Sequence, residues 1–150
     1  METKYKGILM QTDKLNRNGR IYPEEIFNKA VEEYKQKKNT HGVIYGELGH
    51  PDNFETSLKN VSHMIKDIKA KYPKVPRKKK KQMKKAGTYK RTQYVVEYEL
   101  LKTDKGNIAK KIIKDLVPSP RGTGSTDSSG IIQSDYKLLA IDLINAKDRA

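Results

Sequence analysis

The chain has 150 residues, of which 35% are hydrophobic and none is cysteine, and its formal net charge is +14. This length favours one domain with a modest core, and the lack of cysteine excludes disulfides, cysteine nucleophiles and thiolate metal sites and fits a reducing compartment. No apolar run approaches the roughly eighteen residues that a membrane-spanning helix needs, so we expect no membrane partner.

The first third of the chain predicts a strand, a turn, a helix and a second strand. Residues 4–11 alternate weakly between polar and apolar side chains, and residues 16–20 include the turn-forming Asn-Gly pair. Apolar residues at helical spacing begin after Pro23 and continue to about residue 37. Residues 42–48 then predict a strand that ends in a turn.

The middle of the chain predicts two strands separated by a basic segment. Residues 60–70 alternate in polarity, and residues 93–101 are rich in β-branched and aromatic side chains, which favours a strand. Residues 74–91 contain eight lysines, two arginines and no acid, so they carry +10 and leave only +4 for the other 132 residues. Because the basicity is local, we interpret this segment as an insertion in a single domain that comprises residues 1–150.

The basic segment has two interpretations. It could bind nucleic acid or an acidic scaffold protein through electrostatic contacts of Lys78–Lys85. The alternative is a solvated, disordered loop that joins two strands.

The last third predicts a short helix at about residues 107–116, a Gly/Ser-rich flexible segment at residues 122–130, and a buried strand at residues 136–144. The elements together predict an α+β fold in which five or more strands, mostly antiparallel, accompany two helices.

Residues 46–52 read Gly-Glu-Leu-Gly-His-Pro-Asp and place His50 beside a rigid turn. Histidine is the usual general base near neutral pH. The alternative is a purely structural role, in which the histidine only closes the turn at the end of a strand.

Residues 118–125 read Pro-Ser-Pro-Arg-Gly-Thr-Gly-Ser and place a serine beside an arginine and two glycines. Ser119 becomes a nucleophile if a base removes its proton, and Arg121 and Gly122 are candidates to bind an oxyanion. Alone, this fragment is more typical of a loop without chemistry, but with the His50 fragment it indicates a serine protease.

A third residue should orient the imidazole. Asp142 is the first candidate, because an acid in an otherwise apolar strand needs a partner. His63, which also fits a core histidine, and Glu47 are the alternatives. The three histidines share no ligand spacing and no phosphate-binding loop is present, so we expect neither a metal nor a cofactor.

These fragments, in this order, resemble the prohead core serine proteases of tailed phages, which are distantly similar to herpesvirus assemblin. The matching segments are residues 16–23 with the helix that follows, 46–51, 61–63, 100–110, 119–125 and 135–144.

The resemblance implies a small mixed, mostly antiparallel β-barrel flanked by helices, and a serine endopeptidase with a His-Ser-based triad. His50 falls on the family histidine and Asp142 on the approximate position of the third residue. The family serine region reads Ser-Ser-Arg-Gly, whereas this chain has Ser119-Pro120-Arg121-Gly122. If the first serine is the nucleophile, Ser119 keeps the role; if it is the second, Pro120 makes the chain inactive.

The resemblance further implies that scaffold and major capsid proteins are the substrates, cut inside the assembling prohead in the host cytoplasm, and that the protease also cuts itself. A homo-oligomer is compatible with this interpretation. The competing hypothesis is an inactive relative or a non-enzymatic module that binds through residues 74–91.

Overall fold

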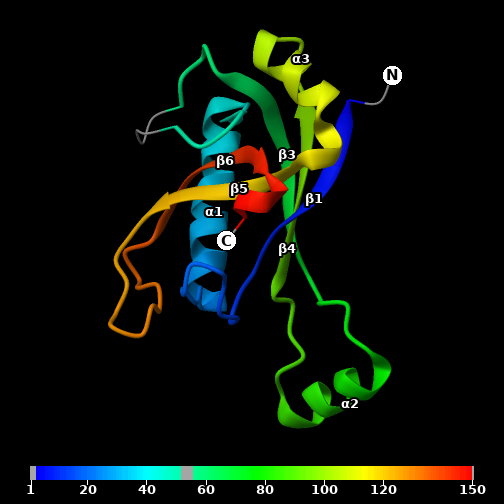
Figure 1. Cartoon of the computed structure of the whole chain (residues 1–150). Coiled ribbons are helices and arrows are strands. Elements are labelled where there is room, and N and C mark those ends of the chain that lie inside the picture. The colour runs from blue at the N-terminus through cyan, green and yellow to red at the C-terminus, as the bar shows by residue number, and fades with distance from the viewer. Residues whose placement is uncertain (1–2, 52–55, 150) are drawn as a thin grey trace.

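The computed structural model describes residues 3–51 and 56–149 (Figure 1). In chain order its elements are β1 (Lys4–Gln11), α1 (Glu24–His41), β2 (Tyr45–Glu47), β3 (Val61–Lys71), α2 (Arg77–Ala86), β4 (Gln93–Leu100), α3 (Asp104–Lys111), β5 (Leu116–Thr123) and β6 (Lys137–Asn145), with two 3₁₀ turns, η1 (Ile113–Asp115) and η2 (Ala146–Asp148).

The strands form two antiparallel sheets, one with the order β1-β4-β3-β2 and one made of β5 and β6. Helix α1 runs behind the β5–β6 pair in Figure 1. The predicted α+β architecture with antiparallel sheets is therefore confirmed.

The core lies between α1 and the sheets. Buried α1 residues recur at helical spacing, and buried β4 residues alternate along the strand, as amphipathic elements require. The α1 residues are Phe27, Ala30, Val31 and Tyr34, and those of β4 are Tyr94, Val96, Tyr98 and Leu100.

A closed barrel is not confirmed, because the ladders of the described residues stay in two separate sheets. The sheets do approach each other on both sides. Leu48 forms an isolated parallel bridge to Leu143 of β6, and β1 passes so close to β5 that a Cβ on Gly7 would lie 2.7 Å from the Pro118 ring.

Two prolines explain why β1 and β5 form no ladder. Pro118 and Pro120 occupy alternate positions of β5, so their nitrogens face the same edge, and a proline nitrogen has no hydrogen to donate. The Arg149 guanidinium lies at this seam, where it donates to the carbonyls of Ile8 and Pro118. A side chain therefore links the strands where main-chain bonds are missing.

The basic segment is not the disordered loop that was one of its two interpretations. It contains α2, which lies beyond the ends of β3 and β4, away from the other elements (Figure 1).

The short helix expected at about residues 107–116 also differs from the structure. Helix α3 begins at Asp104, where Thr103 Oγ1 accepts from the amide of Gly106, and β5 begins at Leu116.

Within the described residues, none of the helices combines the length and the apolarity that crossing a bilayer would require.

Candidate active site

Three of the predicted site residues, from three separate segments, meet at one point. His50 follows β2, while Ser119 and Asp142 are directly opposite each other in the β5–β6 ladder and so share a face. His50 Nδ1 lies 2.8 Å from Asp142 Oδ2, and His50 Nε2 lies 3.2 Å from Ser119 Oγ. If Nδ1–H donates to the carboxylate, Nε2 is left to accept the serine proton.

The loop after β2 positions His50. Gly49 has φ of 83°, a conformation that favours glycine, and its amide donates to the carbonyl of Leu143 at 2.7 Å. Together with the Leu48–Leu143 bridge, this bond fixes the loop on β6. The imidazole is thereby placed over the neighbouring Asp142.

Asp142 is fully buried, and hydrogen bonds surround its carboxylate. Apart from His50, it accepts from the Glu47 amide at 3.0 Å and from Arg121 Nε and Nη2 at 2.9 and 3.2 Å. Burial alone would raise the pKa of Asp142, but the bonds from His50, Arg121 and Glu47 outweigh it and hold this pKa below its usual value. The carboxylate therefore stays ionised at neutral pH.

The Arg121 guanidinium lies behind Asp142 and is almost fully buried. Its Nη2 also reaches Glu47 Oε2 at 3.2 Å and Thr56 Oγ1 at 3.1 Å. The sequence suggested that the Arg121 side chain binds the oxyanion, but in the structure this side chain pairs with the carboxylates of Asp142 and Glu47. Glu47, the last of the candidates for the third residue, pairs with Arg121 through its side chain and supports Asp142 through its amide.

His63 is buried against β6, where it contacts Ile141, the residue before Asp142. Its Nε2 donates to the carbonyl of Ile141 at 2.8 Å, and its Nδ1 accepts from the hydroxyl of Ser62 at 2.7 Å. Burial lowers the pKa of His63 to about 4, so the ring is neutral at physiological pH. Both ring nitrogens are occupied, and it is Asp142 rather than His63 that bonds to His50.

Ser119 and His50 open into a cleft of about 600 Å³. Strand β1 forms one wall and the loop of residues 14–20 forms another. A cleft of this size, with a half-buried serine and an exposed imidazole in its lining, has room for part of a polypeptide substrate. Its other lining residues include Ile8, Met10, Lys14, Leu15, Arg17, Arg20, Tyr22, Pro120, Asp148 and Arg149.

The basic wall of this cleft was not predicted from the sequence. Arg17 Nη1 donates to the carbonyls of Lys147 and Arg149, 3.3 Å away in each case, so residues 145–149 are fastened beside the cleft. The Asn and Arg residues at 16–20 were the only sequence signal, and they were interpreted as a turn and as part of the family resemblance, not as part of the site.

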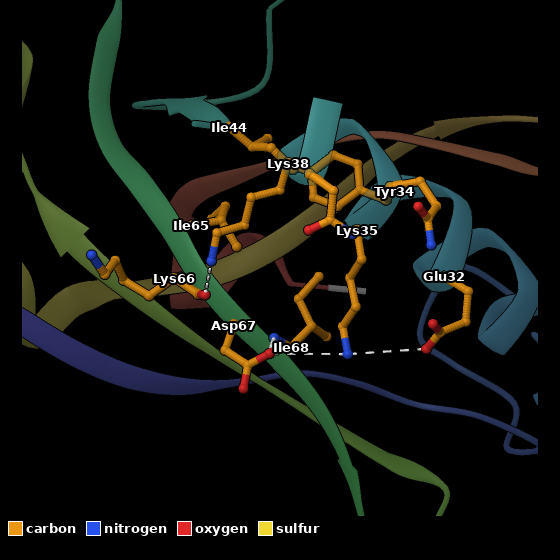
Figure 2. Close-up of a pocket in the computed structure, with 11 residues that line it drawn as sticks. Glu32, Tyr34, Lys35, Lys38, Ile44, Ile65, Lys66, Asp67 and Ile68 are labelled. Atoms are coloured by element: carbon orange, nitrogen blue, oxygen red, sulfur yellow. Dashed lines mark hydrogen bonds and ion pairs between the residues drawn. The ribbon is translucent and has the colours of Figure 1, made fainter. Parts of the chain in front are cut away.

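A smaller hollow of about 230 Å³ lies between α1 and β3 and contains neither Ser119 nor His50. Figure 2 shows Lys35 between Glu32 and Asp67, and its ammonium group lies 4.0 and 3.9 Å from their carboxylates, so the one cation is shared by two acids. In the part of the chain that the structure describes, no group of three or more His, Asp or Glu side chains could hold a metal ion.

The family described as prohead core protein serine protease matches residues 2–138 of this chain. The prohead core protein protease of Enterobacteria phage T4 is 35% identical over 63 residues, which are 42% of this chain and 30% of that relative. This alignment thus spans less than a third of the length of the curated relative. The solved bacteriophage T4 capsid assembly protease, gp21, is 22% identical and matches with a TM-score of 0.71 over 94% of this chain and 80% of that chain, so the two share a fold.

Proposed function

Because the chain belongs to the family of prohead core protein serine proteases, we propose that it is a serine endopeptidase that cleaves internal scaffold and capsid proteins, and itself, during prohead maturation. The observation that carries this proposal is His50, which lies within hydrogen-bond distance of both Ser119 Oγ and Asp142.

The proposed reaction is acyl transfer in two steps. Ser119 Oγ attacks the peptide carbonyl while His50 Nε2 takes its proton and then gives it to the leaving amine. Water then hydrolyses the acyl-enzyme with His50 again as the base. Asp142 holds the imidazole in the required tautomer and stabilises the imidazolium, a role that its buried and ionised state supports.

Main-chain N–H groups near Arg121 and Gly122 are the proposed oxyanion donors. The place of these residues beside a β-bulge supports this assignment, because bulges are common next to active sites; the residue left outside the ladder is Leu139 of β6. The guanidinium of Arg121 contributes indirectly in this proposal, since it keeps Asp142 charged and in place.

Pro120 leaves open the alternative of an inactive relative. The contact of Ser119 with His50 supports the first serine position as the nucleophile. Pro120 itself lines the cleft beside Ser119, where it could shape the path of the substrate.

The family supports the prohead as the place where this protein acts. We propose scaffold and major capsid proteins as its substrates, the host cytoplasm as its compartment, and residues 1–150 as one protease domain. Self-association is a further proposal.

The test is cleavage of a prohead scaffold protein by the wild-type chain and by Ser119→Ala, His50→Ala and Asp142→Asn. Removal of a triad member lowers kcat by about 10⁴-fold or more in such enzymes, and we expect losses of this order. Ser128→Ala, a serine exposed in a loop, is the matched control and should cleave normally. Undiminished cleavage by both Ser119→Ala and His50→Ala would exclude the proposal.

A further inference from the structure

Helix α2 concentrates positive charge without any acid. Seven of its ten residues are Lys or Arg, and none of its residues is buried. Among the described residues, the ion pairs all lie outside α2. The helix is therefore a compact cationic surface.

A helix of this composition is unstable by itself. Ten residues are too few for a stable isolated helix, lysines at i and i+4 repel each other, and basic residues in the first turn oppose the helix dipole. An insertion that only improved solubility would not need to be helical. Since the order has a cost, what holds α2 in place is informative.

A pair of tyrosines holds the helix at the tip of β3 and β4. Tyr72 and Tyr89 stack with ring centroids 4.7 Å apart. Lys80 and Lys84 of α2 lie over the Tyr89 ring, 5.4 and 5.7 Å from its centroid, and Arg91 lies over the Tyr72 ring. These cation–π contacts fix the inner face of the helix.

The fixed inner face leaves a stripe of lysines on the opposite side. Lys78, Lys81 and Lys85 follow the spacing i, i+3, i+7, so they share one face, and all three are exposed. The stacked tyrosines thus hold a row of ammonium groups outward on a rigid element.

We propose that α2 is a binding surface for the phosphate backbone of double-stranded nucleic acid, without sequence preference. A helix of ten residues is about 15 Å long, so the five cations of α2 that do not lie over Tyr89 give about one charge per 3 Å. Duplex DNA carries one negative charge per ~1.7 Å. An extended polypeptide reaches at most one charge per ~3.3 Å, and that only if every residue is acidic, which makes it the poorer match.

The tyrosines also favour a duplex over a single strand. Single-stranded nucleic acid is bound largely by stacking of its bases on free aromatic faces. The rings of Tyr72 and Tyr89 stack on each other, and Lys80 and Arg91 also lie over them, so their faces are already engaged. Lysine, which dominates α2, acts as a point charge and lacks the planar guanidinium with which arginine makes paired hydrogen bonds to a base. The composition therefore fits binding without sequence preference.

The surface lies far from the proposed catalytic residues. His63, which braces the site, and Lys71 are eight residues apart on β3, which corresponds to about 26 Å of strand. Nucleic acid on α2 would therefore lie away from Ser119 and His50. The inference rests on α2 and the two tyrosines that hold it, and it is independent of whether the chain is a peptidase.

The test measures binding of the full chain to a random-sequence DNA duplex of about 20 base pairs by fluorescence anisotropy, from about 50 to 200 mM salt. We expect log Kobs to fall with log[salt] with a slope of roughly −3 to −6, which corresponds to about three to seven neutralised phosphates. Ser119→Ala should bind equally, which separates this surface from the proposed peptidase.

The outer stripe is tested by the triple variant Lys78→Gln, Lys81→Gln, Lys85→Gln. It should weaken binding at least about tenfold and reduce the slope by up to about 3. The matched control, Lys102→Gln, Lys111→Gln, Lys114→Gln, removes the same charge near α3, at the opposite end of the molecule in Figure 1, and should bind like wild type. Circular dichroism verifies that both variants are folded.

Three results would overturn the proposal. The first is an equal loss in the control variant, which would mean that only net charge matters. The second is binding that does not depend on salt. The third is polyglutamate that binds α2 more tightly than DNA does, which would assign the surface to an acidic protein.

Discussion

Asp142 depends on its neighbours more than any other residue of the site. Isolated burial of a carboxylate costs several kcal/mol, so the charge persists only where hydrogen bonds and a cation compensate it. Arg121 supplies the cation, the Glu47 amide supplies a donor, and His50 completes the shell. Asp142, which orients the proposed base His50, is thus itself held in position by Arg121 and Glu47.

Arg121→Met should strongly destabilise the protein, because it leaves the carboxylates of Asp142 and Glu47 buried without their shared cation. Removal of one partner from such a pair costs about 3–5 kcal/mol. Urea unfolding at neutral pH measures the loss, with the exposed Arg20→Met as the control, expected within about 0.5 kcal/mol of wild type. Equal stability of both variants would show that the buried pair contributes little.

His63 predicts a particular dependence of stability on pH. Its folded pKa is about 4 against an ordinary value of 6.5. Between these values the unfolded chain binds a proton that the folded chain does not, so the free energy of unfolding decreases as the pH falls from about 6.5 to 4. The expected decrease is about 3 kcal/mol.

The check is the difference between the pH profiles of wild type and His63→Gln, whose side-chain amide can still donate to the Ile141 carbonyl. The variant should lack this part of the decrease. Parallel profiles would mean that His63 titrates normally in the folded protein.

The contact between β2 and β6 connects the fold to the site. A Cβ on Gly46 would clash with the carbonyl of Ile141 and with the imidazole of His63. Only glycine lets β2 approach β6 closely enough for the loop that follows to carry His50 to Asp142.

Gly46→Ala should therefore lower both stability and activity. We expect a loss of about 2–4 kcal/mol in the free energy of unfolding and roughly 10²-fold in cleavage, because the imidazole would be displaced. Gly87→Ala is the control, since Gly87 has φ of 70° in open space and reports backbone strain alone, about 1 kcal/mol. A cost of Gly46→Ala no larger than that of the control would contradict the close-contact explanation.

Helix α2 should be dispensable for folding. It has no buried residue, and β3 and β4 already pair as far as Lys71 and Gln93. Replacement of residues 75–90 by a short Gly/Ser turn should change the free energy of unfolding by no more than about 1 kcal/mol. Thermal unfolding and cleavage together measure this, and a variant that fails to fold would show that α2 supports the sheets.

Viewed as a whole, the molecule places its cleft at the seam between two sheets. Leu48 and Leu143 join the sheets on one side, while Arg149 links Ile8 and Pro118 on the other. The cleft lies along this second seam, where prolines prevent a continuous ladder. The same feature that leaves the sheets separate therefore leaves β5 accessible beside Ser119.

The sequence predicted those parts of the molecule that depend on local chemistry. His50 beside its turn, Ser119 beside an arginine and two glycines, and Asp142 as the single acid of a buried strand were recognisable from their immediate neighbours. The structure brings these three side chains together, and their catalytic roles stay predictions. The alternation of β4 and the helical spacing of α1 were equally clear, because each buries one face.

Features that depend on distant or unusual contacts were missed. Strand β5 was missed, because the Ser/Gly/Pro composition of residues 118–125 is more typical of a loop. Helix α2 has no apolar periodicity, so it looked like a solvated segment. The pairing of Arg121 with Glu47 joins residues 74 positions apart and depends on side-chain directions that the sequence does not specify.

Covalent labelling with a fluorophosphonate, followed by mass-spectrometric peptide mapping, tests most directly whether the fold makes Ser119 a nucleophile. The account predicts one adduct, on Ser119, that is absent from His50→Ala and from protein unfolded in urea. An unlabelled Ser119 in the folded wild type, or an adduct that forms equally well without His50, would contradict it.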